Sequence, residues 1–287
     1  MIQLFHHLYL YLQKIDLMDI REIYEERIAV YSHDTRNAPR ASILLVHGLG
    51  EHSGRYNEWA ERFVSEGIAF RAFDLPGHGL SGGKRGVMPD YGRIFLIIEN
   101  LIEGLGNDFP GVPVFLYGHS LGGGLVLSML IKNTPPVTGA IVTSPWVRLT
   151  EEPPALKVWL AGISKKIIPG LTQKSGLKTK YLSHDPQVVA AYEHDPLVHG
   201  LISAGLFSSA TEAAEEILKH ASEIELPLLL IHGRDDMIAS PSGTIEVAGA
   251  APRATLKLWD GAYHEVHNDI MRDEHFDFIL EWINTLL

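Results

Sequence analysis

The sequence predicts an α/β fold in which a mostly parallel central sheet carries helices on both faces and a mainly helical insertion interrupts the chain. Three observations predict this fold. Short apolar runs of strand length recur along the chain, helix-like stretches separate them, and one long region contains no convincing strand. Because the apolar runs are nearly continuous, both faces of each strand must be buried, as in a parallel sheet.

The predicted strands are the apolar runs at 43–46, 68–73, 112–117, 140–142, 228–231 and 255–259. The predicted helices fall between or after them, at 56–66, 121–132, 243–250 and 274–287. This alternation is typical of an α/β architecture.

Residues 146–224 break this alternation. They contain the helix-like stretches 155–168 and 200–221 but no run that reads as a strand. A helical insertion at this point would cover the edge of the sheet where the strands end, so we interpret it as a cap. The α/β core is then expected at 21–145 and 225–287.

Residues 1–20 are expected to form an N-terminal extension. The segment is apolar at first but lacks a basic start and a small-residue cleavage site, and Lys14 and Asp16 end its apolar run too early for a bilayer span. Two explanations stay open. Either Met18 is the natural first residue, or the segment is a short amphipathic element that contacts a membrane or a partner.

We expect a cytoplasmic protein.

The composition excludes several classes of function. The chain has 287 residues, 46% of them apolar, which is enough for a large core. Its formal charge of −11 argues against a nucleic-acid partner, because such binding needs clustered Lys and Arg side chains. The sequence has no cysteine, so disulfides, thiolate metal sites and a cysteine nucleophile are all excluded.

The run Gly118-His119-Ser120-Leu121-Gly122 has the G-x-S-x-G pattern of a nucleophile elbow. It stands between a predicted strand and a predicted helix, and its glycines let the two approach closely. The start of the helix offers free N–H groups, so the Leu121 amide can donate to an oxyanion. The alternative is a glycine-rich turn in which Ser120 only caps the helix.

A serine nucleophile needs a histidine to accept its proton and a carboxylate to orient that histidine. His264 follows the last predicted strand, and Asp235 and Asp236 follow the strand before it, which gives the chain order Ser, Asp, His. The later position favours Asp236, but spacing alone leaves both aspartates open. The loop after the first predicted strand can aim the Leu49 amide at the same oxyanion.

No cofactor and no metal are expected. Gly77–Gly82 matches the dinucleotide-binding fingerprint but leads into further glycines and Pro89 rather than into a helix. His264 and His267 are one residue too close together for the zinc-binding H-E-x-x-H motif.

With these motifs the sequence resembles the α/β-hydrolase superfamily and, within it, the monoacylglycerol lipases and lysophospholipase-like proteins. The resemblance runs from about residue 28 to the C-terminus. It rests on the segments 46–56 (VHGLGEHSGRY), 73–82 (FDLPGHGLSG), 118–122, Tyr192 with 195–197, and 261–264. It implies an α/β-hydrolase fold and the hydrolysis of a small lipid ester such as a monoacylglycerol.

The resemblance also implies a role for particular residues. It assigns the catalytic triad to Ser120, Asp236 and His264, which chooses Asp236 over Asp235, and the oxyanion hole to the amides of Leu49 and Leu121. Around the glycerol hydroxyls it places Glu51, Arg55, Tyr192 and His267. It further implies that the cap helix 155–168 docks on a membrane, the alternative being that this helix packs on the core.

Some features depart from the family pattern or leave alternatives open. Leu121 and Gly124 stand where the animal lipases commonly have methionine and another small residue. The cap at 146–224 resembles the family's cap in general character rather than in particular motifs, so acyl-chain preference stays open. The alternatives are a lysophospholipase, a general carboxylesterase and a catalytically silent binding scaffold. Related dehalogenases and epoxide hydrolases carry aspartate where Ser120 stands.

Overall fold

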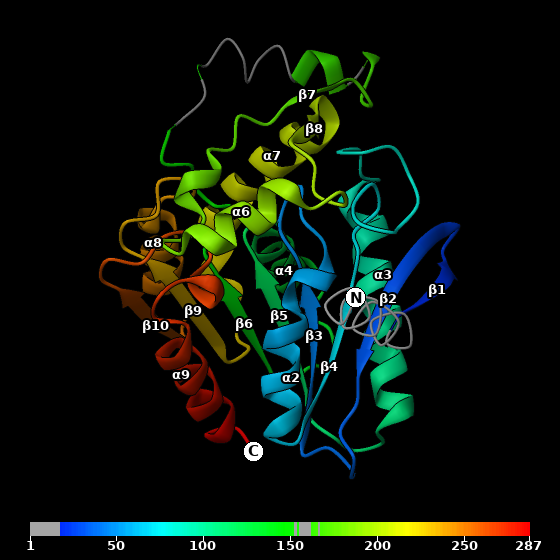
Figure 1. Ribbon diagram of the computed structural model, residues 1–287, viewed down its shortest axis with the longest axis vertical. Helices are drawn as coiled ribbons and strands as arrows, with labels where there is room; N and C mark the ends of the chain where they lie inside the picture. Colours follow the sequence, from blue (N-terminus) through cyan, green and yellow to red (C-terminus); the bar gives the residue numbers. More distant parts are fainter. Residues whose placement is uncertain (1–17, 152–153, 155–161, 166) are drawn as a thin grey trace, which may run out of the picture.

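The computed structural model describes residues 18–151, 154, 162–165 and 167–287 (Figure 1). Its main sheet has eight strands in the order β1-β2-β4-β3-β5-β6-β9-β10. Their bounds are β1 Met18–Ile23, β2 Glu26–His33, β3 Ala41–Val46, β4 Ile68–Phe73, β5 Val114–His119, β6 Gly139–Thr143, β9 Leu228–Gly233 and β10 Ala254–Trp259.

Five of the seven strand pairings in this sheet are parallel, and only β1–β2 and β2–β4 are antiparallel. The predicted mostly parallel sheet is therefore confirmed. Each of the six predicted strands is present, with its ends shifted by no more than two residues.

The α-helices of the described chain are α2 Asn57–Ser65, α3 Tyr91–Asp108, α4 Leu121–Lys132, α6 Pro186–His194, α7 Ala204–His220, α8 Pro241–Ala250 and α9 Arg272–Asn284. Short 3-10 helices occur at η1 Ser53–Tyr56, η2 Thr179–Tyr181, η3 Ala221–Glu223 and η4 Val266–Asn268. The helix α3 was not among the predicted ones. It begins after Pro89, with the Asp90 side chain accepting the Arg93 amide as its N-cap.

Two hydrophobic layers enclose the sheet, one on each face. The alternation of side chains along β3 shows the division, because Ile43 and Leu45 pack in one layer whereas Leu44 and Val46 pack in the other. Buried residues of α2 and α9 belong to the first layer, and those of α3, α4 and α7 to the second. Helices therefore cover both faces, as the sequence predicted.

The antiparallel hairpin of β1 and β2 was not predicted. Only one of the six residues in β1 is buried, so the strand lacks the continuous apolar run that marks its neighbours. Residues 18–20, which were expected to lie in the N-terminal extension, belong to this strand and pair with β2. The other residues of the expected extension, 1–17, lie outside the described chain.

The segment 146–224 contains two short strands, so the expectation that it has none was wrong. β7 (Thr172–Lys174) and β8 (Leu201–Ser203) form a separate antiparallel pair, drawn with α6 and α7 above the main sheet in Figure 1. Three residues per strand are too few to show a period in the sequence. The expected helix at 200–221 is present as α7, which packs against α4 of the core. Most of the expected helix 155–168 lies outside the described residues.

Candidate active site

Ser120 occupies a strained turn between the end of β5 and the start of α4. Its backbone has φ 53° and ψ −115°, in the left-handed half of the conformational map that non-glycine residues seldom occupy. The strain is sustained by close packing of the flanking glycines: a Cβ on Gly118 would lie 2.5 Å from the Gly122 carbonyl oxygen, and one on Gly122 would lie 2.1 Å from that of Val46. Ser120 makes no side-chain cap to α4, contrary to the alternative role considered for it.

The side chains of Ser120, His264 and Asp236 form a continuous hydrogen-bonded chain. The Ser120 Oγ lies 3.0 Å from His264 Nε2, and His264 Nδ1 lies 2.7 Å from Asp236 Oδ2. In this arrangement Nδ1–H donates to the carboxylate, which leaves Nε2 as the acceptor for the serine hydroxyl proton. The exposed neighbour Asp235 contributes no side-chain contact to this chain.

The Asp236 carboxylate is buried and held on both oxygens. Oδ1 accepts the amides of Ile238 at 2.7 Å and Ala239 at 3.0 Å, while Oδ2 also faces His232 Nε2 at 3.0 Å. His232 is a fully buried partner of the carboxylate, fixed on its other nitrogen by the Thr244 hydroxyl at 2.6 Å.

Electrostatics tune the histidine for proton acceptance. Burial alone would lower the pKa of His264, but the charge and hydrogen bond of Asp236 outweigh it and raise the pKa above the ordinary value of 6.5. For Asp236, burial favours the protonated form, yet the two histidines beside it hold the pKa of the carboxyl below its ordinary value. Asp236 is therefore ionised at neutral pH.

The two amides expected to form the oxyanion hole have no competing acceptor in the described part of the chain. Leu121 is the first residue of α4, so its N–H lacks an intrahelical partner. Leu49 lies in the turn after β3, and no hydrogen bond of the described residues uses its N–H. Leu49 lines the cavity at Ser120, Leu121 directly follows the serine in the chain, and both amides are free to donate.

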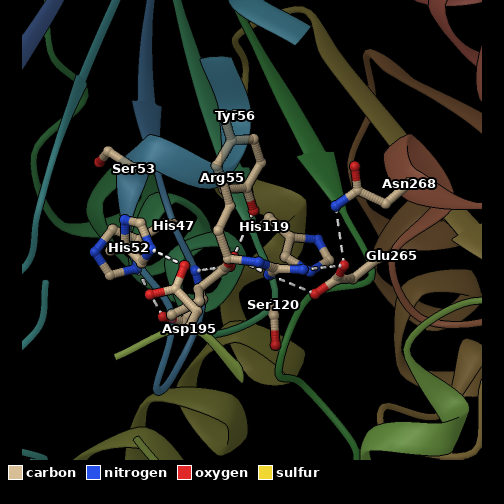
Figure 2. Close-up of polar contacts among 12 residues, drawn as sticks. His47, His52, Ser53, Arg55, Tyr56, His119, Ser120, Asp195, Glu265 and Asn268 are labelled. Carbon is tan, nitrogen blue, oxygen red and sulfur yellow. Dashed lines mark hydrogen bonds and ion pairs between the residues drawn. The ribbon is translucent and has the colours of Figure 1, made fainter. Parts of the chain in front are cut away.

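Of the four residues expected around the glycerol hydroxyls, Glu51 and Tyr192 line the cavity, whereas Arg55 and His267 do not. Arg55 is enclosed by carboxylates: its guanidinium donates to Glu51 and, as Figure 2 shows, to Glu265. Glu265, which was not predicted, lines the cavity beside Glu51. The Tyr192 ring lies over this group, 4.7 Å from the Arg55 guanidinium carbon.

His267 is buried behind the site. Its ring stacks on Tyr56 at 4.7 Å between centroids, and neither ring nitrogen has a partner in the described residues. Burial lowers its pKa to about 4, so the ring is neutral at physiological pH. His267 thus packs against the floor of the site rather than facing the substrate space.

The cavity at Ser120 has a volume of about 350 Å³ and combines polar and apolar walls. The apolar wall is contributed mainly by the segment 146–224 and the loop after β9, through Trp146, Leu149, Leu177, Ile202, Phe207 and Ile238. Within the described residues, no group of three or more His, Asp or Glu side chains is arranged to hold a metal ion. The cavity therefore offers a nucleophile, a polar side and a surface for a hydrocarbon chain.

This fold and this geometry define a serine hydrolase of the α/β-hydrolase class. The model of the serine aminopeptidase S33 family of hydrolases matches residues 37–271, and the chain belongs to that family. It is a monoacylglycerol lipase-like member and an ester hydrolase.

Several relatives share most of their length with this chain. A monoacylglycerol lipase of Mycolicibacterium smegmatis is 32% identical over 267 residues, covering 92% of this chain and 93% of that protein. The crystal structure of Paleococcus ferrophilus monoacylglycerol lipase has a TM-score of 0.83 at 36% identity, covering 90% of this chain and 99% of that one.

A Dictyostelium discoideum protein described as an uncharacterized abhydrolase domain-containing protein is 35% identical over 263 residues, but the match spans 28% of that longer protein. No helix in the described part of this chain is long and apolar enough to cross a membrane.

Proposed function

We propose that this protein hydrolyses monoacylglycerols to glycerol and a free fatty acid through an acyl-enzyme on Ser120. The observation that carries the proposal is the hydrogen-bonded chain of Ser120, His264 and Asp236 at a cavity with one polar and one apolar side. The names of the M. smegmatis and P. ferrophilus relatives support the choice of substrate.

In the proposed first step, the Ser120 Oγ attacks the acyl carbonyl carbon while His264 Nε2 takes the hydroxyl proton. The ionised Asp236 stabilises the imidazolium that forms. The Leu49 and Leu121 amides donate to the oxyanion of the tetrahedral intermediate. When the intermediate collapses, the proton on Nε2 passes to the departing glycerol oxygen and the acyl group stays on Ser120.

In the second step, His264 Nε2 takes a proton from water as the water oxygen attacks the acyl carbonyl. The ester bond to Ser120 breaks, the serine recovers the proton, and the fatty acid leaves. Residues 146–224 are proposed to act as a cap in both steps, because their apolar side chains line the cavity opposite the core. Such a wall would hold the acyl chain and limit the entry of water.

Replacement of the nucleophile tests this function. Ser120→Ala should lower the rate of monoacylglycerol hydrolysis by at least about 10⁴-fold, because neither attack nor acyl transfer can occur. Ser128→Ala is the control, since it makes the same change at a serine that lies inside α4, two turns beyond Ser120, and takes no part in the hydrogen bond with His264. Full activity of Ser120→Ala with an unchanged melting temperature would overturn the proposal.

A lysophospholipase and a general carboxylesterase would use the same residues. They are separated from the proposed function by initial rates on monoacylglycerol, lysophospholipid and p-nitrophenyl esters of equal chain length. Monoacylglycerol should be the fastest natural lipid. An amino-acid anilide should be inert, which distinguishes ester hydrolysis from the peptidase activity in the family name.

We also propose that the exposed apolar side chains of Ile167, Ile168 and Leu171 contact a membrane. These side chains are 72%, 56% and 53% exposed, and they lie close together in the sequence. The double variant Ile167→Asp, Ile168→Asp should bind less to phosphatidylcholine vesicles in sedimentation, whereas Ile20→Asp on β1 should bind like wild type. Equal sedimentation of the wild-type protein, the double variant and Ile20→Asp would contradict the proposed membrane contact.

A further inference from the structure

Glu51, Arg55 and Glu265 form a buried charged network beside Ser120. Figure 2 shows Arg55 and Glu265 of this network. Arg55 Nη1 donates to Glu51 at 2.6 Å and to Glu265 at 2.7 Å, and Nη2 donates to the second oxygen of Glu265 at 2.7 Å. Their side chains are only 4%, 10% and 2% exposed, respectively. Two carboxylates share one guanidinium, so the network has a formal charge of −1.

The network lies next to the nucleophile because Gly48, which has no side chain, leaves room for both. A Cβ there would lie 2.8 Å from Glu51 Oε1 and 3.1 Å from the Ser120 Cβ. Both Glu51 and Glu265 line the cavity, so the negative side of the network faces the space next to the reacting ester.

The positive charge of the network is not available to a ligand. Both Nη1 protons of Arg55 and one on Nη2 point at carboxylates, and Arg55 does not line the cavity. Among the described lining residues, the one ammonium group is that of Lys178, which is paired with Glu151. A phosphate group, which proteins bind with Arg or Lys, would therefore meet no unpaired cation here.

The carboxylates keep room for hydroxyl donors. An ionised carboxylate has about four acceptor positions. Glu51 accepts from the Gly48 amide, the Tyr56 hydroxyl and Arg55, and Glu265 accepts twice from Arg55 and once from Asn268. Each thus has one acceptor position left. A glycerol hydroxyl can donate to it, whereas an ionised phosphate oxygen can only accept.

Building on the proposed function, we propose that the Glu51–Arg55–Glu265 network selects the alcohol part of the substrate by charge. It admits esters of neutral polyols and rejects esters whose alcohol carries a phosphate. The selectivity arises from repulsion between like charges at side chains that are almost fully buried, together with the lack of an unpaired cation among the described lining residues.

Three substrates with the same acyl chain test this selectivity in the wild-type protein. They are a monoacylglycerol, the corresponding acylglycerol phosphate, and the corresponding acylglycerophosphocholine. The values of kcat/KM should fall in the order neutral, zwitterionic, anionic, with the anionic substrate at least about tenfold below the neutral one. Equal values would overturn the proposal. A lower kcat/KM for the zwitterionic substrate than for the anionic one would also overturn it, because the values would then follow head-group size rather than charge.

A variant tests whether the network causes the order. Glu265→Gln removes one negative charge while Glu51 stays paired with Arg55, so the anionic-to-neutral ratio of kcat/KM should rise about tenfold. Asp273→Asn, which removes an exposed carboxylate that pairs with Arg62 on the surface, should leave the ratio unchanged. An unchanged ratio in folded Glu265→Gln would overturn the role of the network. If that variant does not fold, the wild-type order decides.

The outcomes separate this proposal from the function on which it rests. Cleavage of p-nitrophenyl esters without cleavage of any glycerol ester would overturn the proposed function and the selectivity with it. Equal cleavage of monoacylglycerol and its phosphate ester would overturn the selectivity alone.

Discussion

Replacing Asp236 with asparagine should reverse the proton arrangement of His264. The Ile238 and Ala239 amides donate to Oδ1, so an asparagine would place its carbonyl oxygen there and turn its NH₂ group toward His264 and His232. Nδ1 of His264 would then have to accept a hydrogen bond. The proton would move to Nε2, and that nitrogen could no longer accept the proton of Ser120.

The expected loss in kcat for Asp236→Asn is about 10⁴-fold, or ~5 kcal/mol in the activation free energy, the effect of a wrong histidine tautomer in serine hydrolases. The assay is steady-state hydrolysis of a monoacylglycerol, with the melting temperature as the test of folding. Asp235→Asn is the matched control, because its exposed side chain takes no part in the chain of hydrogen bonds. A loss smaller than about tenfold in a folded Asp236→Asn protein would refute the tautomer argument.

The protonation of His264 and the packing of the turn at Ser120 can be tested in the same way. Asp236 raises the pKa of His264 above 6.5, so kcat/KM should fall as the pH is lowered through a value above 6.5. A loss of kcat/KM centred below pH 6.5 would contradict this. Gly122→Ala should destabilise the protein by about 3 kcal/mol in urea unfolding, because its Cβ would meet the Val46 carbonyl at 2.1 Å. Gly104→Ala in α3 has open space for a Cβ and should stabilise the protein by about 0.5–1 kcal/mol; equal effects of the two changes would contradict the packing argument.

The parts of the fold that could be predicted are those whose signal is local. The strand, glycine turn and helix around Ser120 follow one another within a few residues, and close contacts require glycine at positions 118 and 122. The parallel strands are buried on both faces, so their apolar runs stand out in the sequence.

The hairpin of β1 and β2 could not be predicted for the opposite reason. Its turn residues Tyr24 and Glu25 have φ angles of 50° and 68°, yet neither is the glycine or asparagine that usually reveals such a turn. β1 is mostly exposed, so it has no continuous apolar run either. The structure of this part of the chain depends on pairing at the edge of the sheet.

For the candidate site, the sequence predicted which residue types meet but not every contact. The order serine, aspartate, histidine was visible, because each residue follows a strand of the parallel sheet. Spacing alone left Asp235 and Asp236 open, and the family resemblance chose Asp236. Glu265 was missed because its partner Arg55 is 210 residues away, and a charged loop residue carries no local sign of such a pair. His232 was missed because its contact with Asp236 depends on the path of the loop after β9.

Covalent labelling tests whether Ser120 is the nucleophile. The wild-type protein would be treated with a fluorophosphonate, and the modified peptide would be located by mass spectrometry. The proposal predicts one added phosphonyl group on Ser120, and none in Ser120→Ala or after acid protonates His264. Labelling at another serine, or equal labelling of Ser120→Ala, would contradict it.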